Sequence, residues 1–214
     1  MKAPKNRRVF VIGYGAATPL GRTFSTTWER AVKAEAGFRT VTRCHVKTLS
    51  HVVGEIPDWD PLHLGLADEK EVYNWNAAFV ILTMAVCREA LEHAGLIMDN
   101  GVAPKTACLI GSAINGTDAF RYAVEKLRDQ GPLKVSPYLL PNICANLPAG
   151  KAGMELGFTG PIFSPQGACA SANYALALGA RMIRDGDCDF ALAGGVDMPV
   201  IPEILHGFAN MNAT

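Results

Sequence analysis

The chain has no excess of charge of either sign. Its 20 Lys and Arg residues balance its 20 Asp and Glu residues, so the formal net charge is zero. Domains that bind nucleic acid usually carry a basic surplus, and the sequence shows none. Charged residues make up 19% of the 214 residues, below the roughly 25% of an ordinary soluble domain. We therefore expect no nucleic-acid partner, and a chain that buries much of its surface or docks on another protein.

No apolar run is long and continuous enough to cross a bilayer, which takes about 20 residues. The uncharged stretch 72–87 is too short, and the stretch 156–180 is interrupted by Pro161, Pro165 and several glycines. At the amino terminus, basic residues precede an apolar run that ends at Gly13, which is too short for a secretory signal. We predict no transmembrane segment and no secretory signal.

The six cysteines form no metal or redox motif. They contain no C-x-x-C pair and no spacing typical of zinc ligands. They stand at positions 44, 87, 108, 144, 169 and 188. Scattered cysteines of this kind are typical of a reducing compartment, because disulfides persist mainly in secreted proteins. The sequence predicts a cytoplasmic protein without a metal site.

Apolar patterning alternates between short β-rich runs and helical segments. The expected strands cover residues 8–13, 46–56, 106–111, 162–164 and 189–193. The expected helices cover residues 26–36, 69–93, 118–128, 142–155 and 170–184. Strands that alternate with helices are typical of an α/β fold, and no linker or repeat divides the chain. We predict one α/β domain over residues 1–214.

Three of the expected helices carry more specific predictions. Thr26 and Glu29 have the spacing of a capping box at the start of the first helix. The segment 69–93 lacks Gly and Pro and has a nearly all-apolar centre at residues 77–87, which predicts one long, mostly buried helix. The segment 170–184 is apolar on nearly every face, which predicts a helix enclosed between layers.

Cys169 lies at the turn between a predicted strand and a predicted helix. The partial positive charge at the start of a helix favours the thiolate, which is the nucleophilic form of cysteine. Gly167, Ala168 and Ala170 are small and leave a carbonyl substrate room to approach. The backbone N–H of Cys169 is a candidate oxyanion donor. The alternative is inert packing, because free cysteines are often buried.

Four short segments along the chain are distinctive in sequence and in spacing. They are the segment 11–21 (VIGYGAATPLG), the segment 111–116 (GSAING), the segment 168–171 (ACAS) and the segment 193–195 (AGG). In order and spacing these segments resemble the β-ketoacyl-(acyl-carrier-protein) synthases, the condensing enzymes of the thiolase fold, and within them the elongating type. The resemblance covers the whole chain.

The resemblance implies the first half of a thiolase-like, layered α-β-α fold, with a mixed sheet and a buried helix after the nucleophile. Residues 1–214 are then the N-terminal domain, and the C-terminal half is absent from this chain. Cys169 takes an acyl group from acyl carrier protein for decarboxylative condensation with malonyl-ACP, which gives 3-oxoacyl-ACP. No cofactor of its own is implied, because the phosphopantetheine arrives on the carrier protein.

The resemblance also carries over four residues around the acyl chain. Ile114 and Phe208 match positions that line or gate the acyl pocket, and Leu139 matches a position that reaches the pocket from a partner subunit. Ala168 adjoins the nucleophile. For Ile114, Leu139 and Phe208 the alternative is ordinary core packing.

The sequence departs from the family in two respects. The usual Thr-Ala-Cys-x-x-Gly is here 167–172 (GACASA), so both flanking positions differ. The family's second half supplies two catalytic histidines, and none of the five histidines of this chain matches them. A half-fold with few charges would expose a broad apolar face. We therefore expect a homodimer or an assembly with a chain that bears the missing half.

Two other functions remain open. The first is a non-catalytic scaffold or chain-length partner of a ketosynthase, although such partners usually lack the nucleophilic cysteine. The second, less favoured, is a cysteine α/β hydrolase, whose elbow requires G-x-C-x-G, whereas Ser171 fills the last glycine position. The sequence does not distinguish fatty-acid from polyketide synthesis.

Overall fold

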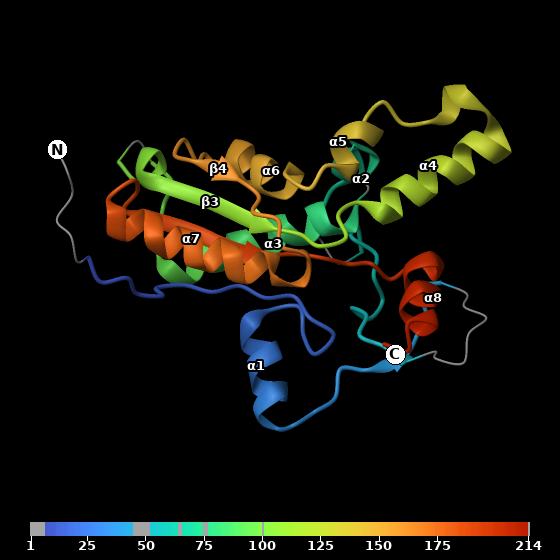
Figure 1. The fold of residues 1–214 in the computed structure, drawn as a ribbon, viewed down its shortest axis with the longest axis horizontal. Helices are drawn as coiled ribbons and strands as arrows, with labels where there is room; N and C mark the ends of the chain where they lie inside the picture. The colour runs from blue at the N-terminus through green and yellow to red at the C-terminus, as the bar shows by residue number, and fades with distance from the viewer. Residues whose placement is uncertain (1–6, 45–51, 64–65, 75–76, 100, 214) are drawn as a thin grey trace.

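A computed structural model describes residues 7–44, 52–63, 66–74, 77–99 and 101–213 (Figure 1). Its α-helices are α1 (Phe24–Val32), α2 (Glu69–Asn74), α3 (Ala78–Ala94), α4 (Thr117–Gln130), α5 (Leu139–Ile143), α6 (Leu147–Leu156), α7 (Ser171–Asp185) and α8 (Pro202–Asn210). Its strands are β1 (Arg39–Thr40), β2 (Val52–Val53), β3 (Thr106–Gly111), β4 (Ile162–Phe163) and β5 (Phe190–Gly195). Three short 3-10 turns are η1 (Ala103–Lys105), η2 (Pro132–Lys134) and η3 (Ala168–Ala170).

The central sheet has three parallel strands in the order β4-β3-β5. β3 has the bounds that the sequence predicts, and β4 and β5 lie within about two residues of theirs. Parallel and antiparallel pairing both occur among the described strands, as the resemblance implies, but in separate sheets. Among the strands described, antiparallel pairing joins only β1 to β2, in a separate two-stranded ribbon. Each parallel neighbour of β3 is reached through helices, as parallel connections require.

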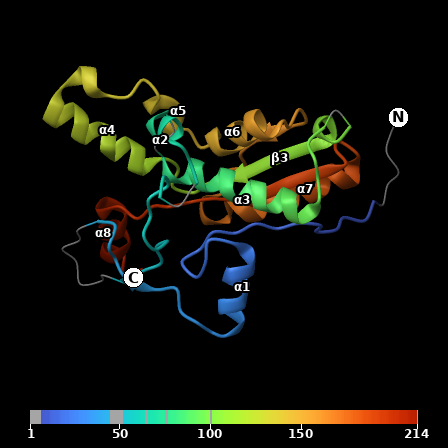
Figure 2. The same cartoon turned by 180° about the vertical axis from the view of Figure 1, so that it is seen from behind.

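Helices cover both faces of this sheet. All six residues of β3 are buried, and alternate residues point to opposite faces. Ala107 and Leu109 pack in a cluster with Ala175 of α7. Cys108 and Ile110 pack instead with side chains of α3 and α6. Figure 1 shows α7 on the near side of the sheet, and Figure 2 shows α3 from behind. The layered α-β-α arrangement is therefore confirmed.

The long helix expected at 69–93 is two helices, α2 and α3. Ala77 has an extended backbone and offers no side-chain cap to α3. Instead, Asn142 Oδ1 accepts the Ala77 N–H at 3.3 Å, and Asp118 Oδ2 accepts the Ala78 N–H at 2.9 Å. The first turn of α3 is thus satisfied by α4 and α5 rather than by a continuing helix. The helix ends where predicted, at Gly95 with φ 64°.

The helix expected at 142–155 is also divided, into α5 and α6. Pro148 stands in the first turn of α6. A proline has no backbone N–H and its ring clashes with the carbonyl four residues earlier, so a helix that began at Asn142 could not continue through it. The proline is well placed where it is, because the first N–H groups of a helix have no partner within the helix.

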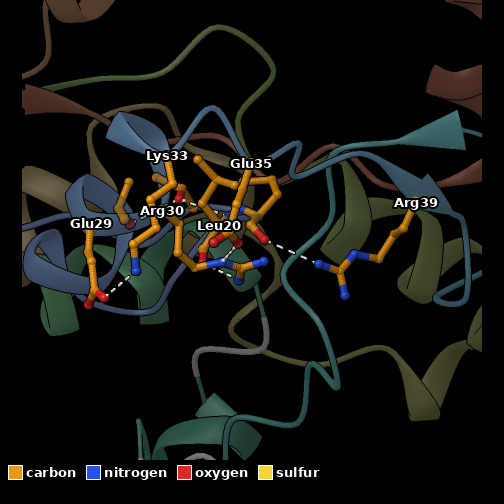
Figure 3. Close-up of polar contacts among 9 residues, drawn as sticks. Leu20, Glu29, Arg30, Lys33, Glu35 and Arg39 are labelled. Atoms are coloured by element: carbon orange, nitrogen blue, oxygen red, sulfur yellow. Dashed lines mark hydrogen bonds and ion pairs between the residues drawn. The ribbon is translucent and has the colours of Figure 1, made fainter.

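The capping box predicted for the first helix is wrong. Thr23 caps α1, and its Oγ1 accepts the Thr26 N–H at 3.2 Å. Glu29 instead pairs with Lys33 at 2.7 Å. Arg30 donates to the Leu20 carbonyl at 2.6 Å and Arg39 donates to the Pro19 carbonyl at 3.2 Å (Figure 3). These contacts hold α1 and β1 against the turn at residues 18–21.

The segment 8–13, predicted as a strand, pairs with none of the described strands. This segment is exposed, with Val11 at 82% and Phe10 at 66% of full exposure. It ends against α3, because a Cβ built on Gly13 would lie 2.3 Å from the Ala90 carbonyl oxygen. Of the irregular strand predicted at 46–56, residues 46–51 lie outside the described part, and β2 forms from the remainder.

Helix α7 is less enclosed than the sequence predicts. Its buried residues are Ser171, Ala175 and Gly179, which form one stripe against the sheet. On other faces, Tyr174 is 54% and Leu176 is 53% exposed. The expectation of a helix buried on nearly every face is therefore not met within the described part of this chain, whereas the expected exposed apolar surface is present. None of the described helices has the length and apolar character needed to cross a membrane.

Candidate functional site

Cys169 lies on the connection that follows β4 and leads into α7. It is the middle residue of η3 and is exposed. Because the three strands are parallel, the loops after β3, β4 and β5 leave the sheet at the same edge. This is the edge at which parallel α/β sheets bind ligands. The strand, turn and helix predicted around Cys169 are thus found, and Cys169 is exposed.

The turn before Cys169 is tightly constrained. Ala168 has φ 48°, a left-handed conformation that costs an L-residue about 1–2 kcal/mol. Ser171 Oγ accepts the Gly167 N–H at 3.0 Å and donates to the Ala168 carbonyl at 2.7 Å. A Cβ on Gly167 would lie 2.2 Å from the Tyr174 ring. A larger residue at 167 would therefore displace that ring, which accounts for glycine at this flanking position.

The loop after β3 lies beside this turn and carries Ile114. Ser171 Oγ is 3.4 Å from the Ser112 carbonyl oxygen, and a Cβ on Gly111 would lie 2.7 Å from Ser171 Cβ. The structure therefore brings three of the predicted site residues to one edge of the sheet, namely Cys169, Ala168 and Ile114. The Ile114 N–H donates to Asp197 at 2.8 Å, so this N–H group is not free to bind a ligand.

The other two predicted residues stand elsewhere. Leu139 is the first residue of α5, which packs with α4 in the part of the molecule that projects from the sheet (Figure 1). Phe208 lies on α8, with 36% of its surface exposed. Two surface cavities have volumes of about 430 Å³ each. One lies between the ends of α3 and α6 and the other lies beside Trp59, and neither is lined by a predicted site residue. An acyl pocket around Cys169 remains a prediction.

The cysteines differ sharply in their surroundings. Burial raises the pKa of the Cys108 thiol to about 12 and also raises the pKa of the thiols of Cys87 and Cys188. These three side chains are buried in the core, whereas Cys144 and Cys169 are exposed. Among the described residues, no cluster of three or more His, Cys, Asp or Glu side chains is arranged to hold a metal ion.

Sequence reasoning missed the hydrogen-bonding residues of this edge. Asp197 follows β5 and accepts from the loop after β3. Ser171 appears in the sequence only as a small neighbour of Cys169. An acidic residue two positions after the Gly194-Gly195 strand end is the one signal that could have indicated Asp197, but its partners are more than 80 positions away.

Comparison with known proteins identifies the family. The family model described as the beta-ketoacyl synthase N-terminal domain matches residues 6–214. The chain belongs to the beta-ketoacyl synthase family. It is 30% identical over 211 residues to 3-oxoacyl-(acyl-carrier-protein) synthase 2 of Staphylococcus aureus, covering 98% of this chain and 50% of that protein. The enzyme of the same name from Coxiella burnetii is 30% identical over 210 residues, with the same two shares covered.

Solved structures show that the chain has the ketosynthase fold. A beta-ketoacyl synthase from Burkholderia phymatum is 20% identical with a TM-score of 0.76, covering 100% of this chain and 51% of that one. A ketosynthase in complex with its chain length factor, from Xenorhabdus doucetiae, is 18% identical with a TM-score of 0.76, covering 94% and 50%. The chain spans about half the length of the curated relatives it matches.

Proposed function

We propose that this chain is the N-terminal domain of a ketosynthase and that Cys169 is its acyl acceptor. The observation that carries the proposal is the placement of an exposed cysteine on a constrained turn at the carboxyl edge of a parallel sheet. Small residues on both sides leave a thioester carbonyl room to reach the Sγ atom. The curated relatives are named as 3-oxoacyl-(acyl-carrier-protein) synthases, which is the same chemistry.

In the first step, the Cys169 thiolate attacks the carbonyl carbon of an acyl thioester. The bond between that carbon and the donor sulfur breaks, the donor sulfur leaves as a thiolate that takes up the proton given up by the Cys169 thiol, and the acyl group remains on Cys169. The donor sulfur belongs to the phosphopantetheine arm of acyl carrier protein, so the chain needs no cofactor of its own. Ile114, Ala168, Phe208 and Leu139 are the proposed contacts of the acyl chain, with Leu139 acting from a partner subunit.

In the second step, a malonyl thioester loses CO₂ and the resulting carbanion attacks the acyl carbon on Cys169. A carbon–carbon bond forms, the Cys169 thiolate leaves, and a 3-oxoacyl thioester is released. The resemblance assigns the histidines that assist decarboxylation to the second half of the fold. We propose that a segment equivalent to that half completes the site, in the cytoplasm, and that the chain assembles as a homodimer or with a partner through its exposed apolar surface.

The exposed apolar surface supports such a partner. Phe10, Val11 and Ile12 are at least half exposed, as are Tyr174 and Leu176 of α7. Apolar surface of this kind marks an interaction site in a soluble protein. Light scattering coupled to size exclusion tests the proposal on the purified chain. We expect self-association at low concentration, whereas a well-behaved monomer that melts cooperatively would contradict it.

Intact mass spectrometry tests the acyl acceptor. The chain is incubated with acyl-loaded carrier protein and with a small acyl thioester, and the wild type is compared with Cys169→Ala. A single acyl adduct that is lost only in Cys169→Ala supports the proposal. Cys144→Ala is the matched control, because Cys144 is the other cysteine that is exposed. Equal labelling of Cys144 and Cys169, or none at either, would contradict a specialised nucleophile.

The alternative of a non-catalytic chain-length partner makes a different prediction. One solved neighbour is a ketosynthase in complex with its chain length factor. A scaffold would bind a ketosynthase without forming the Cys169 adduct. Stoichiometric acylation in the presence of acyl-loaded carrier protein therefore separates the acyl acceptor from the scaffold.

A further inference from the structure

Asp197 gathers the loop after β3 around a single carboxylate. Its Oδ1 accepts the Ser112 hydroxyl at 2.9 Å and the Ile114 N–H at 2.8 Å, and its Oδ2 accepts the Ala113 N–H at 2.8 Å. Hydrogen bonds to an ionised acceptor are stronger than those between neutral groups. One side chain at the end of β5 thus fixes the loop that leaves the neighbouring strand.

The buried Ser112 hydroxyl links Asp197 to the next part of the same loop. Ser112 is 1% exposed, and its hydroxyl also accepts the Asn115 N–H at 3.0 Å. Asn115 has φ 59°, so a second residue at this edge is held in the left-handed region. Strained backbone of this kind persists only where surrounding contacts over-determine it, and it is concentrated at functional sites.

Ser171 plays the equivalent part at the turn before Cys169. It is 3% exposed and its hydroxyl bridges the peptide groups of Gly167 and Ala168. The two serine-held loops touch, because Ser171 Oγ lies 3.4 Å from the Ser112 carbonyl and Gly111 leaves no room for a side chain against Ser171. A shift of the loop after β3 is therefore transmitted to the turn that carries Cys169.

We propose that Asp197 and Ser171 are positioning residues that hold Cys169 in its attacking geometry through the loop after β3. The proposal rests on the proposed function of Cys169 as acyl acceptor. Neither side chain reacts with the acyl group. Their contribution is orientation, and displacement of a reacting group by about 1 Å costs on the order of 100-fold in rate. Asp197 is the more useful residue to test because it is exposed, so its substitution leaves the core intact.

The first test measures acylation of Cys169 by a small acyl thioester as a function of thioester concentration. We expect Asp197→Ala and Ser171→Ala to lower the maximal rate by about tenfold or more while the half-saturating concentration changes less than about twofold. Asp197→Asn keeps one acceptor oxygen and should give an intermediate rate. Asp189→Asn is the matched control. Asp189 lies just before the same strand and pairs with Arg7 on the surface, so the rate should not change.

A second measurement separates positioning from loss of stability. Alkylation of Cys144 in the same molecules serves as an internal reference, and labelling of buried Cys108 reports unfolding. A positioning role lowers acylation of Cys169 while both of these stay at the wild-type rate. A merely structural role raises the labelling of Cys108 in the same variants. A wild-type maximal rate in Asp197→Ala, with Cys169 still acylated, would overturn the proposal and leave the proposed function standing.

Hydrogen exchange tests the coupling without any acyl donor. In the wild type, the Gly167 amide is protected by Ser171 and the Ala113 amide by Asp197. Asp197→Ala should lower protection at Gly167 as well as at Ala113, whereas Asp189→Asn should change neither. The two failures are distinguishable. Absence of acylation at wild-type Cys169 contradicts the proposed function, whereas unchanged protection at Gly167 in Asp197→Ala contradicts the coupling, whether or not Cys169 is acylated.

Discussion

Helices α3 and α7 cover opposite faces of the same sheet but are surrounded very differently. Eight residues of α3 are buried, including every residue from Ala78 to Met84. Only three residues of α7 are buried, and all three are small or polar. Both helices were expected to be buried from their apolar composition. The difference lies in what the chain supplies around each of them.

Three separate clusters enclose α3. Met84 packs toward the sheet and α6, Leu82 packs with Ile56 and Met198, and Phe79 packs with Ala119 of α4. Among the described residues, those that bury the inner face of α7 belong to the sheet and the segment that leads into β5. The fold is therefore complete on the α3 side and open on the α7 side. The proposed second half of the ketosynthase would bury the exposed face of α7, as the clusters around α3 bury that helix.

The largest expected effect comes from truncating equivalent apolar residues on the two helices. Phe79 is 1% exposed and Leu176 is 53% exposed. Phe79→Ala should lower the free energy of unfolding by about 3–5 kcal/mol, because it removes a buried ring and leaves a cavity. Leu176→Ala should change it by less than about 0.5 kcal/mol in the isolated chain. Urea titration followed by circular dichroism measures both.

That comparison sharpens when the partner is added. If α7 is covered in the assembly, Leu176→Ala should lower the affinity for the partner that covers α7. The stability of the isolated variant should be unchanged. Equal losses for Phe79→Ala and Leu176→Ala in the isolated chain would show that α7 is already enclosed, contrary to the structure.

The thiols provide a second comparison. At pH 8, Cys169 and Cys144 should react with iodoacetamide at least about 100-fold faster than Cys87 and Cys108, because the thiolate is the reactive form and burial raises the pKa of the latter two thiols. Peptide mapping after timed quenching measures each rate. Denatured protein is the control, in which all six cysteines should label. Fast native labelling of Cys108 would contradict the buried sheet face.

The smallest expected effect concerns the cap of α3. Burial raises the pKa of Asp118 above its ordinary value of 3.8, although the N–H groups of Ala78 and Ala119 and the charge of Arg43 oppose that rise. The folded state therefore binds this proton more tightly than the unfolded state. The contribution of Asp118 to the free energy of unfolding should increase as the pH falls from neutral through its folded pKa, and decrease as the pH rises.

Asp118→Asn isolates this contribution. The amide keeps an oxygen for the Ala78 N–H but does not titrate. The stability of the wild type relative to Asp118→Asn should therefore rise as the pH is lowered from 7 toward 4, as measured by thermal melts at each pH. A constant difference would show that Asp118 has the same proton affinity in both states.

The sequence predicts best where the signal is local. β3 is a continuous apolar run bounded by Lys105 and a glycine, and its predicted bounds are those observed. The turn at Cys169 was also predicted, because Pro165 and Gly167 mark the break between β4 and α7. The end of α3 at Gly95 follows from the same kind of local signal.

The remaining features depend on contacts between distant residues. No local pattern shows that Asp118 and Asn142 satisfy the first turn of α3, so 69–93 was predicted as one helix. The segment 8–13 has the composition of a strand, but pairing needs a free sheet edge in the right place, which composition does not reveal. Asp197 was missed for the same reason, since its partners are known only once β3 and β5 are adjacent.

The distant caps of α3 also bear on when its first turn can be completed during folding. Asp118 and Asn142 lie 40 and 65 residues along the chain from the N–H groups that they accept. Closing such long loops is slower than forming a helical turn, because the loss of chain entropy comes before any stabilising contact is made. During synthesis, α3 emerges well before either cap. The apolar residues of its first turn that pack on α4, Phe79 among them, must therefore remain exposed until α4 has been made, and such transiently exposed surface favours aggregation.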